Sequence, residues 1–591
     1  MTRELRRLSI VMLFMFIALF AATSWIQVVE SDSLAQNSNN QRTRLDSYEI
    51  QRGSIIVDGV AIATSIPSDD RYQFQREYAD AAMWAPVTGY FNAPLDARTG
   101  IEQAMNADLS GTGSNAFLAE IERIISGQPQ SGFSVELSLN TAAQRAAYEA
   151  LDGLKGAVIA IEPKTGRILA MASTPGFDTN LLATHDADAA NAAYDQLAAD
   201  PSKPLSNRAI AGDLNPPGST FKILVAAAAF ASGDFTPEST LPNPAIYTLP
   251  GSNNRVSNAW GGACGPGETV TIAEAIRLSC NIPMAELAVE LGDDKIREMA
   301  EKFGFNQSFE TPLVSTPSSY PRALDDAQTA LTGFGQGQVT ATPLQIAMVA
   351  AGIANDGVVM NPHMVDTVIG EDLSVIRAFE NSEFGRAMDK DVADEVTAAM
   401  VASVSTGAAQ GARIDGVDVA GKTGTAENGN RPHTLWFTGF APADDPAVAV
   451  AVVVEDGGGQ GQSGSGDTIA APIAKKVIEA VLGRLGRRRV CRSVVATSCC
   501  RVLRSAAWAR CGRRRITSSD GPSRSRSSRT STWGTLGSSS GSALRRATLR
   551  SSTMRGSPAS STTARRTAAP TSSWSSCPVK PCRPCSSATA R

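Results

Sequence analysis

At 591 residues the chain is too long for one compact domain, and the usual domain size of about 100–200 residues predicts three or four segments. Its hydrophobic content of 42% supports a large core and excludes wholesale disorder. The net charge of −4 is a cancellation, because residues 484–591 hold 22 arginines and one lysine against a single acid, which leaves the preceding 483 residues strongly acidic.

An N-terminal membrane anchor is predicted first along the chain. Residues 8–29 run without a charge and follow Arg3, Arg6 and Arg7. A helix of that length spans about 33 Å, enough to cross a bilayer core, and the arginines keep residues 1–7 in the cytoplasm as a short stub. A cleaved signal peptide is the alternative, but its apolar region is shorter. We expect a single-pass protein of the cytoplasmic membrane whose remaining residues lie outside the cytoplasm.

Cysteine and histidine spacing bears on redox chemistry and metals. Outside the cytoplasm, Cys264 and Cys280 are free to form a disulfide, and two buried free thiols are the alternative. The histidines, at 185, 363 and 433, are scattered and form no metal-ligand pattern. We therefore expect neither a metal nor a cofactor.

Two folded segments follow the anchor. Residues 30–150 are polar with short apolar runs, including one strand-like stretch at 54–65, and predict a small α+β pedestal. Residues 151–485 predict a larger α+β domain. Its expected elements are a β-hairpin at 156–173 turning at 163–166, an Ala-rich helical middle at 218–400, strands at 416–426, 434–441 and 447–455, and a helix at 470–482. Early strands and late strands then complete one antiparallel sheet.

Residues 486–591 change character abruptly. They are rich in Arg, Ser, Thr and Pro and show no helical or strand periodicity, so we expect disorder. A nucleic-acid arm and a contact with anionic polymer or lipid are alternatives. The anchor places this tail across the membrane from nucleic acid, so no nucleic-acid partner is expected. We interpret the tail as the product of a shifted reading frame.

The first chemical motif is Ser219 followed three residues later by Lys222, at the start of an apolar helical run. A helix N-terminus favours developing negative charge, and the spacing places the amine within reach of the hydroxyl. A lysine becomes a base when burial or a neighbouring cation lowers its pKa. Taken alone, the pair reads more simply as a capping serine and a solvated lysine.

Two further motifs follow in order. Ser279 and Asn281 come 60 residues downstream of Ser219, after a helical run. The run Lys422–Thr425 lies on a predicted strand, where Gly424 leaves room for a substrate backbone to add to the strand edge. Each of these reads alone as an ordinary turn or strand. Together with Ser219 and Lys222, they indicate one serine active site.

This trio resembles the motifs of class B penicillin-binding proteins, most of all the actinobacterial penicillin-binding protein A group. The likeness covers roughly residues 1–485. It includes the anchor and the runs RGSI at 52–55, PLSNRAI at 204–210 and GQGQVTATPLQIA at 335–347. It implies a β-lactamase-like, penicillin-recognising serine-transferase domain, in which an antiparallel sheet is flanked by helices, preceded by a pedestal or dimerisation-like domain.

The resemblance also implies roles for residues. Ser219 attacks the carbonyl of a terminal D-Ala-D-Ala, and Lys222 takes its proton. Ser279 relays a proton to the leaving amine, and Asn281 holds the peptide amide. Lys422 lowers the pKa of Lys222 and attracts the substrate carboxylate. Thr423 and Thr425 bind that carboxylate, and the backbone N–H groups of Ser219 and Thr425 form the oxyanion hole.

The expected function is a peptidoglycan D,D-transpeptidase that joins a D-Ala-D-Ala donor to an amine acceptor of a neighbouring stem peptide. Expected partners are these stem peptides, β-lactams, the membrane and a membrane glycan polymerase. Three alternatives stay open at this point. They are a D,D-carboxypeptidase, a β-lactamase, and a non-enzymatic membrane β-lactam sensor, for which a cytoplasmic stub of seven residues leaves no signalling module.

Overall fold

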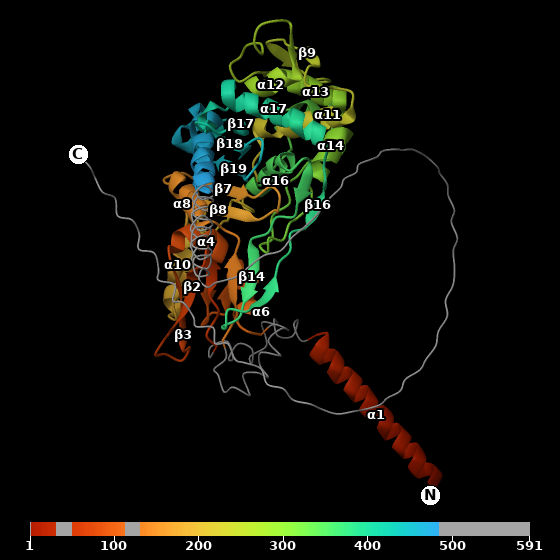
Figure 1. Ribbon diagram of the computed structural model, residues 1–591, viewed down its shortest axis with the longest axis vertical. Helices are drawn as coiled ribbons and strands as arrows, with labels where there is room; N and C mark the ends of the chain where they lie inside the picture. Colours follow the sequence, from red (N-terminus) through yellow and green to blue (C-terminus); the bar gives the residue numbers. More distant parts are fainter. Residues whose placement is uncertain (1, 31–49, 113–130, 484–591) are drawn as a thin grey trace, which may run out of the picture. The chain divides into compact units, whose positions relative to one another are not determined.

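The computed structural model describes residues 2–30, 50–112 and 131–483 (Figure 1). Helix α1 (Thr2–Val28) is one continuous helix of 27 residues. Among the described residues it is the one helix that is long and apolar enough to cross a membrane. The predicted tail at 486–591 and the link between anchor and pedestal at 31–49 lie outside the described residues.

The pedestal is built on a six-stranded sheet in the order β15-β14-β6-β1-β2-β3. The strands are β1 (Ile55–Val57), β2 (Val60–Pro67), β3 (Phe74–Tyr78), β6 (Ser134–Leu137), β14 (Val365–Ile369) and β15 (Val375–Ala378). The expected single stretch at 54–65 is a hairpin, because Asp58 and Gly59 both adopt positive φ and turn the chain. Strands β14 and β15 also belong to this sheet, although their residues lie within the predicted 151–485 domain.

A buried ion cluster holds the pedestal together. Glu102 of α5 (Gly100–Ala104) accepts from Arg52 Nε at 2.5 Å and from Arg76 Nε at 2.7 Å, and all three side chains are almost fully buried. The hydroxyl of Tyr78 donates to the same carboxylate at 3.1 Å. Burial alone would raise the pKa of Glu102, but the cations of Arg76 and Arg52 outweigh it and hold that pKa below its ordinary value.

Short elements complete the pedestal and its connection to the larger domain. They are α4 (Ala81–Thr88), β4 (Phe91–Asn92), β5 (Ala97–Arg98), α6 (Asn106–Leu109), α9 (Asn180–Ala183) and α10 (Ala187–Ala199). Arg167, in the turn of the 156–173 hairpin, donates through Nε to Asp366 of β14 at 3.0 Å. An ion pair therefore ties the hairpin turn of the larger domain to the pedestal sheet.

The larger domain contains the predicted antiparallel sheet, in the order β17-β18-β19-β7-β8. Its strands are β7 (Gly156–Ile161), β8 (Ile168–Thr174), β17 (Ala420–Asn428), β18 (Arg431–Ala441) and β19 (Val448–Val454). The hairpin of β7 and β8 is confirmed, and β19 pairs antiparallel with β7 from Ala449↔Ile161 to Val454↔Gly156. The two ends of the domain thus meet within one sheet, and β17 forms one edge of it.

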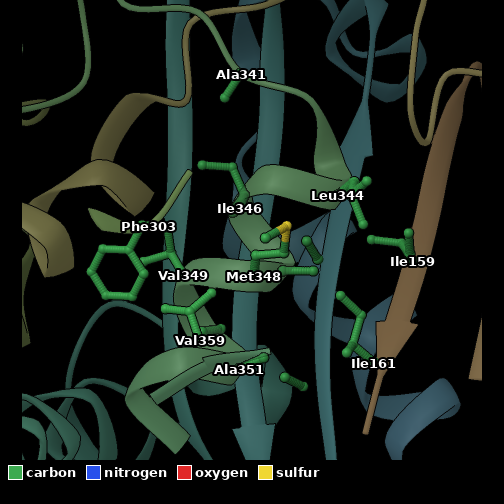
Figure 2. Close-up of a cluster of buried hydrophobic side chains, with 14 of the residues drawn as sticks. Ile159, Ile161, Phe303, Ala341, Leu344, Ile346, Met348, Val349, Ala351 and Val359 are labelled. Atoms are coloured by element: carbon green, nitrogen blue, oxygen red, sulfur yellow. The ribbon is translucent and has the colours of Figure 1, made fainter. Parts of the chain in front are cut away.

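Alternating side chains of this sheet enter two separate cores. Ile159 and Ile161 of β7 face the core that contains α16 (Pro343–Ala354), and Figure 2 shows them opposite Leu344. Val158 and Ala160 face the other core, which holds α8 (Thr141–Ala150) and the C-terminal helix at 471–483. This alternation is what a period of two predicts for a strand covered on both faces.

The helical middle gathers on the β17 side of the sheet (Figure 1). Its helices are α11 (Lys222–Ser232), α12 (Ile272–Leu278), α13 (Ile282–Leu291), α14 (Asp293–Lys302), α15 (Asp326–Thr332) and α17 (Lys390–Thr406). Short strands interrupt them, namely β9 (Thr240–Pro242), β10 (Ile246–Thr248), β11 (Arg255–Ser257), β12 (Thr269–Thr271), β13 (Val358–Met360) and β16 (Glu383–Arg386). Because α12 and α17 both pack here, and α17 also contacts β17, three distant segments meet at this sheet edge.

Candidate active site

Ser219 lies in a 3₁₀ turn, η1 (Gly218–Phe221), directly before α11. The backbone N–H of Lys222 donates to the carbonyl of Ser219, which closes this turn. In a 3₁₀ turn the side chains three residues apart eclipse one another. The turn therefore presents the hydroxyl of Ser219 and the amine of Lys222 on the same side of the backbone.

Lys222 is fully buried, and its amine has two acceptors. Lys222 Nζ donates to the backbone carbonyl of Ser279 and to Asn281 Oδ1, both at 2.8 Å. Burial lowers the pKa of Lys222 well below its ordinary value, and the nearby cation of Lys422 lowers it further. The site thus favours a neutral amine at this position.

Ser279 ends α12 in a left-handed conformation, with φ 64° and ψ 37°. Serine seldom adopts this backbone region, and such strained residues cluster at functional sites. The turn brings two groups of Ser279 into the site, because its carbonyl accepts from Lys222 and its Oγ accepts from Lys422 Nζ at 2.6 Å.

Lys422 stands on β17 and is also fully buried. Besides Ser279 Oγ, its amine donates to the carbonyl of Thr423 at 3.0 Å. Burial lowers the pKa of Lys422 to about 7. Two buried amines therefore contact the same turn, and the charge of Lys422 disfavours a charge on Lys222.

Gly424 lies where η1 approaches β17. A Cβ on it would lie 2.8 Å from the carbonyl oxygen of Pro217 and 3.1 Å from Thr220 Cγ2. The missing side chain thus lets η1 approach the face of β17. Addition of a substrate backbone at the strand edge stays a prediction, and among the described residues no further strand pairs with β17 on its outer side.

The polar side chains expected to bind substrate are engaged within the protein. Thr423 Oγ1 donates to the carbonyl of Ala408 at 3.0 Å, and Thr425 Oγ1 accepts from Gly466 N at 3.3 Å. Asn281 Oδ1 is held by Lys222, and its Nδ2 donates to the carbonyl of Ser257 at 3.1 Å. Asn281 therefore supports the Lys222 amine directly, a contact that the sequence did not indicate.

Cys264 and Cys280 form a disulfide with Cα atoms 5.7 Å apart. Cys280 lies between Ser279 and Asn281, so the bridge ties this turn to the loop that follows β11. Two buried asparagines near this loop, Asn243 and Asn258, were not predicted from the sequence. Each belongs to a turn without a recognisable motif, so only their contacts in the folded protein show that they support the site.

The penicillin-binding protein transpeptidase domain matches residues 156–479, and the penicillin-binding protein A dimerisation domain matches residues 52–135. The chain is 40% identical over 492 residues to the peptidoglycan D,D-transpeptidase PbpA of Mycolicibacterium smegmatis, which covers 82% of this chain and 99% of that protein. PbpA of Mycobacterium tuberculosis is 38% identical over the same length, with the same two shares.

Solved structures agree with these relatives. Penicillin-binding protein A from M. tuberculosis, as its ceftriaxone acyl-enzyme complex, superposes with a TM-score of 0.72 at 38% identity, covering 74% of this chain and all of that one. Its penicillin G acyl-enzyme complex gives a TM-score of 0.70 at 37% identity, covering 73% of this chain and all of that one. The α+β fold, with its antiparallel sheet, flanking helices and dimerisation domain, is therefore confirmed, and the chain belongs to the class B penicillin-binding transpeptidases.

Proposed function

We propose that this chain cross-links peptidoglycan stem peptides through an acyl-enzyme on Ser219, and that penicillin acylates the same residue. The relatives named peptidoglycan D,D-transpeptidases and the acyl-enzyme complexes with β-lactams support this function. The residue assignment rests on Lys222. Its side chain is buried, two acceptors hold its amine at 2.8 Å, and it directly follows the turn that contains Ser219.

Acylation begins with proton transfer from Ser219 to Lys222. A neutral amine has two N–H groups and one lone pair. The carbonyl of Ser279 and Asn281 Oδ1 accept the two N–H groups, so the lone pair stays available for the serine proton. Ser219 Oγ then attacks the carbonyl carbon of the penultimate D-Ala, and the serine proton resides on Lys222.

Collapse of the tetrahedral intermediate releases D-alanine and needs a proton on its amine. Ser279 Oγ accepts from Lys422, so the proton of its own hydroxyl points elsewhere and is available to the leaving amine. Lys222 replenishes Ser279, which completes the transfer. The amine of a second stem peptide then attacks the acyl carbon and gives a proton to Lys222. The bond from the acyl carbon to Ser219 Oγ breaks, Lys222 returns the proton to Oγ, and the new amide is the cross-link.

The oxyanion hole is assigned to the backbone N–H groups of Ser219 and Thr425. Support comes from the close approach of η1 to β17, where the Cβ position of Gly218 lies 3.2 Å from the carbonyl carbon of Thr425. Donors of this kind typically contribute about 3–4 kcal/mol to the transition state. Lys422, as a cation, attracts the terminal carboxylate of the donor peptide.

Helix α1 supports the proposed membrane arrangement. In this proposal residues 8–29 are the anchor, and the arginines before it stay in the cytoplasm. The pedestal at 30–150 and the transpeptidase domain at 151–485 then lie outside the cytoplasm, next to the cell-wall substrate. A membrane glycan polymerase is the partner that would supply the glycan strands. The proposed reaction needs no cofactor.

The test is the intact mass of the full chain after exposure to penicillin G. Wild type is expected to gain one penicillin mass and keep it for hours, whereas S219A gains none and stays folded by circular dichroism. S405A, on the exposed end of α17, is the matched control and labels like wild type. Labelling of S219A by penicillin would refute the assignment of Ser219 as the nucleophile. Rapid loss of the adduct with penicillin turnover would indicate a β-lactamase-type hydrolase, and release of D-alanine without cross-linking would indicate a carboxypeptidase.

A further inference from the structure

Helix α13 is capped at its N-terminus by a residue of another segment. The first N–H groups of a helix have no partner within the helix, and an asparagine at the N-cap normally accepts one of them. Asn281 is the N-cap of α13, yet its side chain makes no capping bond. Asn258 Oδ1 instead accepts the N–H of Asn281 at 2.6 Å and that of Ile282 at 3.2 Å.

Asn258 thereby fixes the backbone from which the side chain of Asn281 projects. Asn281 Oδ1 accepts from Lys222 Nζ at 2.8 Å. We propose that Asn258 is a positioning residue of the active site: by holding the first N–H groups of α13, it keeps the amide of Asn281 in place to hold the amine of Lys222. This inference rests on the proposed role of Lys222 as the base that activates Ser219.

Asn258 is itself held rigidly. It is 1% exposed, and its Nδ2 donates to the carbonyl of Gly262 at 2.8 Å. The loop it starts ends at Cys264, which is bonded covalently to Cys280, the neighbour of Asn281. Asn243 fastens the same cysteine, because its Oδ1 accepts from Cys264 N at 2.5 Å and its Nδ2 donates to the Cys264 carbonyl at 2.9 Å. A disulfide and two buried amides thus keep the capping oxygen in place.

Removal of the acceptor at residue 258 has a specific consequence. Two N–H groups at the start of α13 lose their partner in a buried setting. An N-cap side chain accepts from the second or third helical N–H, so the side chain of Asn281 cannot replace Asn258 as the partner of its own N–H and that of Ile282. The backbone at 281 and 282 therefore shifts to reach another acceptor. This shift carries Asn281 Oδ1 away from Lys222, so the amine loses one of its two acceptors and its lone pair is no longer directed at Ser219. The chemical step slows, whereas the number of reactive serines does not change.

The experiment measures penicillin G acylation of the full chain by stopped reaction and intact mass. N258A is expected to lower the limiting first-order acylation constant about 10-fold, while the final occupancy remains one adduct per chain. A partly unfolded protein would instead lower the final occupancy. N253A, at an exposed asparagine in the turn between β10 and β11, is the matched control and acylates at the wild-type rate. N258L removes the acceptor but keeps the number and branching of side-chain heavy atoms, and replaces N258A where the smaller side chain prevents folding.

A double-mutant cycle identifies the route of the effect. In an N281A background the amide is already absent, so N258A or N258L is expected to change the rate less than 2-fold. The inference is overturned if the two losses multiply, or if N258A and N258L acylate like wild type. Labelling of S219A would instead refute the proposed function itself, independently of the 258 variants.

Discussion

Lys422 Nζ lies 2.6 Å from Ser279 Oγ, although the two residues are 143 positions apart in the chain. This hydrogen bond joins the edge strand β17 to the turn between α12 and α13. The same turn presents the Ser279 carbonyl to Lys222, so one left-handed serine connects both buried amines. The proposed proton transfer therefore depends on three segments brought together by the fold.

Lys222→Ala is expected to abolish most of the acylation without unfolding the protein. Loss of a general base typically lowers a rate by 10²–10⁴-fold, and removal of a buried amine relieves a desolvation penalty. The measurement is the acylation rate constant with penicillin G, together with the midpoint of thermal unfolding. Lys203→Ala, at an exposed lysine paired with Asp213, is the control. A rate within 10-fold of wild type would assign the base elsewhere.

Lys422→Met is expected to move the acidic limb of the pH–rate profile to higher pH. The acylating form needs a neutral Lys222, so the rate rises as pH increases through the pKa of that lysine. The Lys422 cation lowers this pKa, and its removal leaves burial alone to do so. The pKa of Lys222 therefore rises in the variant, and the neutral base forms at higher pH. Acylation rates measured between pH 5 and 9 check this, and a limb that stays or moves to lower pH contradicts it.

The same substitution is expected to change how stability depends on pH. The pKa of Lys422 is about 7 in the folded protein and about 10.4 for an unfolded lysine. Between these values the unfolded chain binds more protons, so the free energy of unfolding rises with pH, by up to about 1.4 kcal/mol per pH unit. Lys422→Met removes this contribution. Urea unfolding at pH 7 and pH 9 measures the change in the free energy of unfolding between these two pH values. If this change is the same in the variant and in wild type, the pKa of Lys422 is not lowered in the folded protein.

Gly424→Ala is expected to slow acylation at least 10-fold with a stability loss of about 1–3 kcal/mol. The new methyl group would lie 2.8 Å from the Pro217 carbonyl oxygen and 3.0 Å from Trp436 Cβ, so η1 must shift away from β17. Acylation kinetics and urea unfolding provide the measurement. Gly385→Ala is the control, since a Cβ there meets no atom within 4 Å. Wild-type kinetics in the Gly424 variant would show that the approach of η1 is not needed.

Glu102→Gln is expected to destabilise the pedestal while acylation per folded molecule stays within 2-fold of wild type. The carboxylate compensates two buried arginines, Arg52 and Arg76, and removal of one partner of a buried ion pair costs about 3–5 kcal/mol. Urea unfolding followed by intrinsic fluorescence measures the loss. Glu77→Gln, exposed on the neighbouring β3, is the control. A loss below 1 kcal/mol would show that the arginines find other acceptors.

Much of the architecture was predictable because it depends on local patterns. The uncharged run at 8–29 is helical in α1, and the turn residues at 163–166 connect β7 to β8. Strand β19, late in the chain, pairs with the early strand β7. Each of these follows from hydrophobic periodicity or turn chemistry within a short window. The order and spacing of the three motifs likewise indicated a serine transferase before any contact was known.

Long-range contacts were decided only by the tertiary structure. Whether Gly424 serves the strand edge or the approach of η1 depends on what packs above it, namely Pro217 and Thr220. The hydrogen bonds that Asn258 Oδ1 accepts from the N–H groups of Asn281 and Ile282 depend on a loop positioned by a disulfide. The membership of β14 and β15 in the pedestal sheet depends on pairing across more than 200 residues. Such contacts have no local signal, because hydrogen bonding and burial between distant segments arise only once the chain has folded.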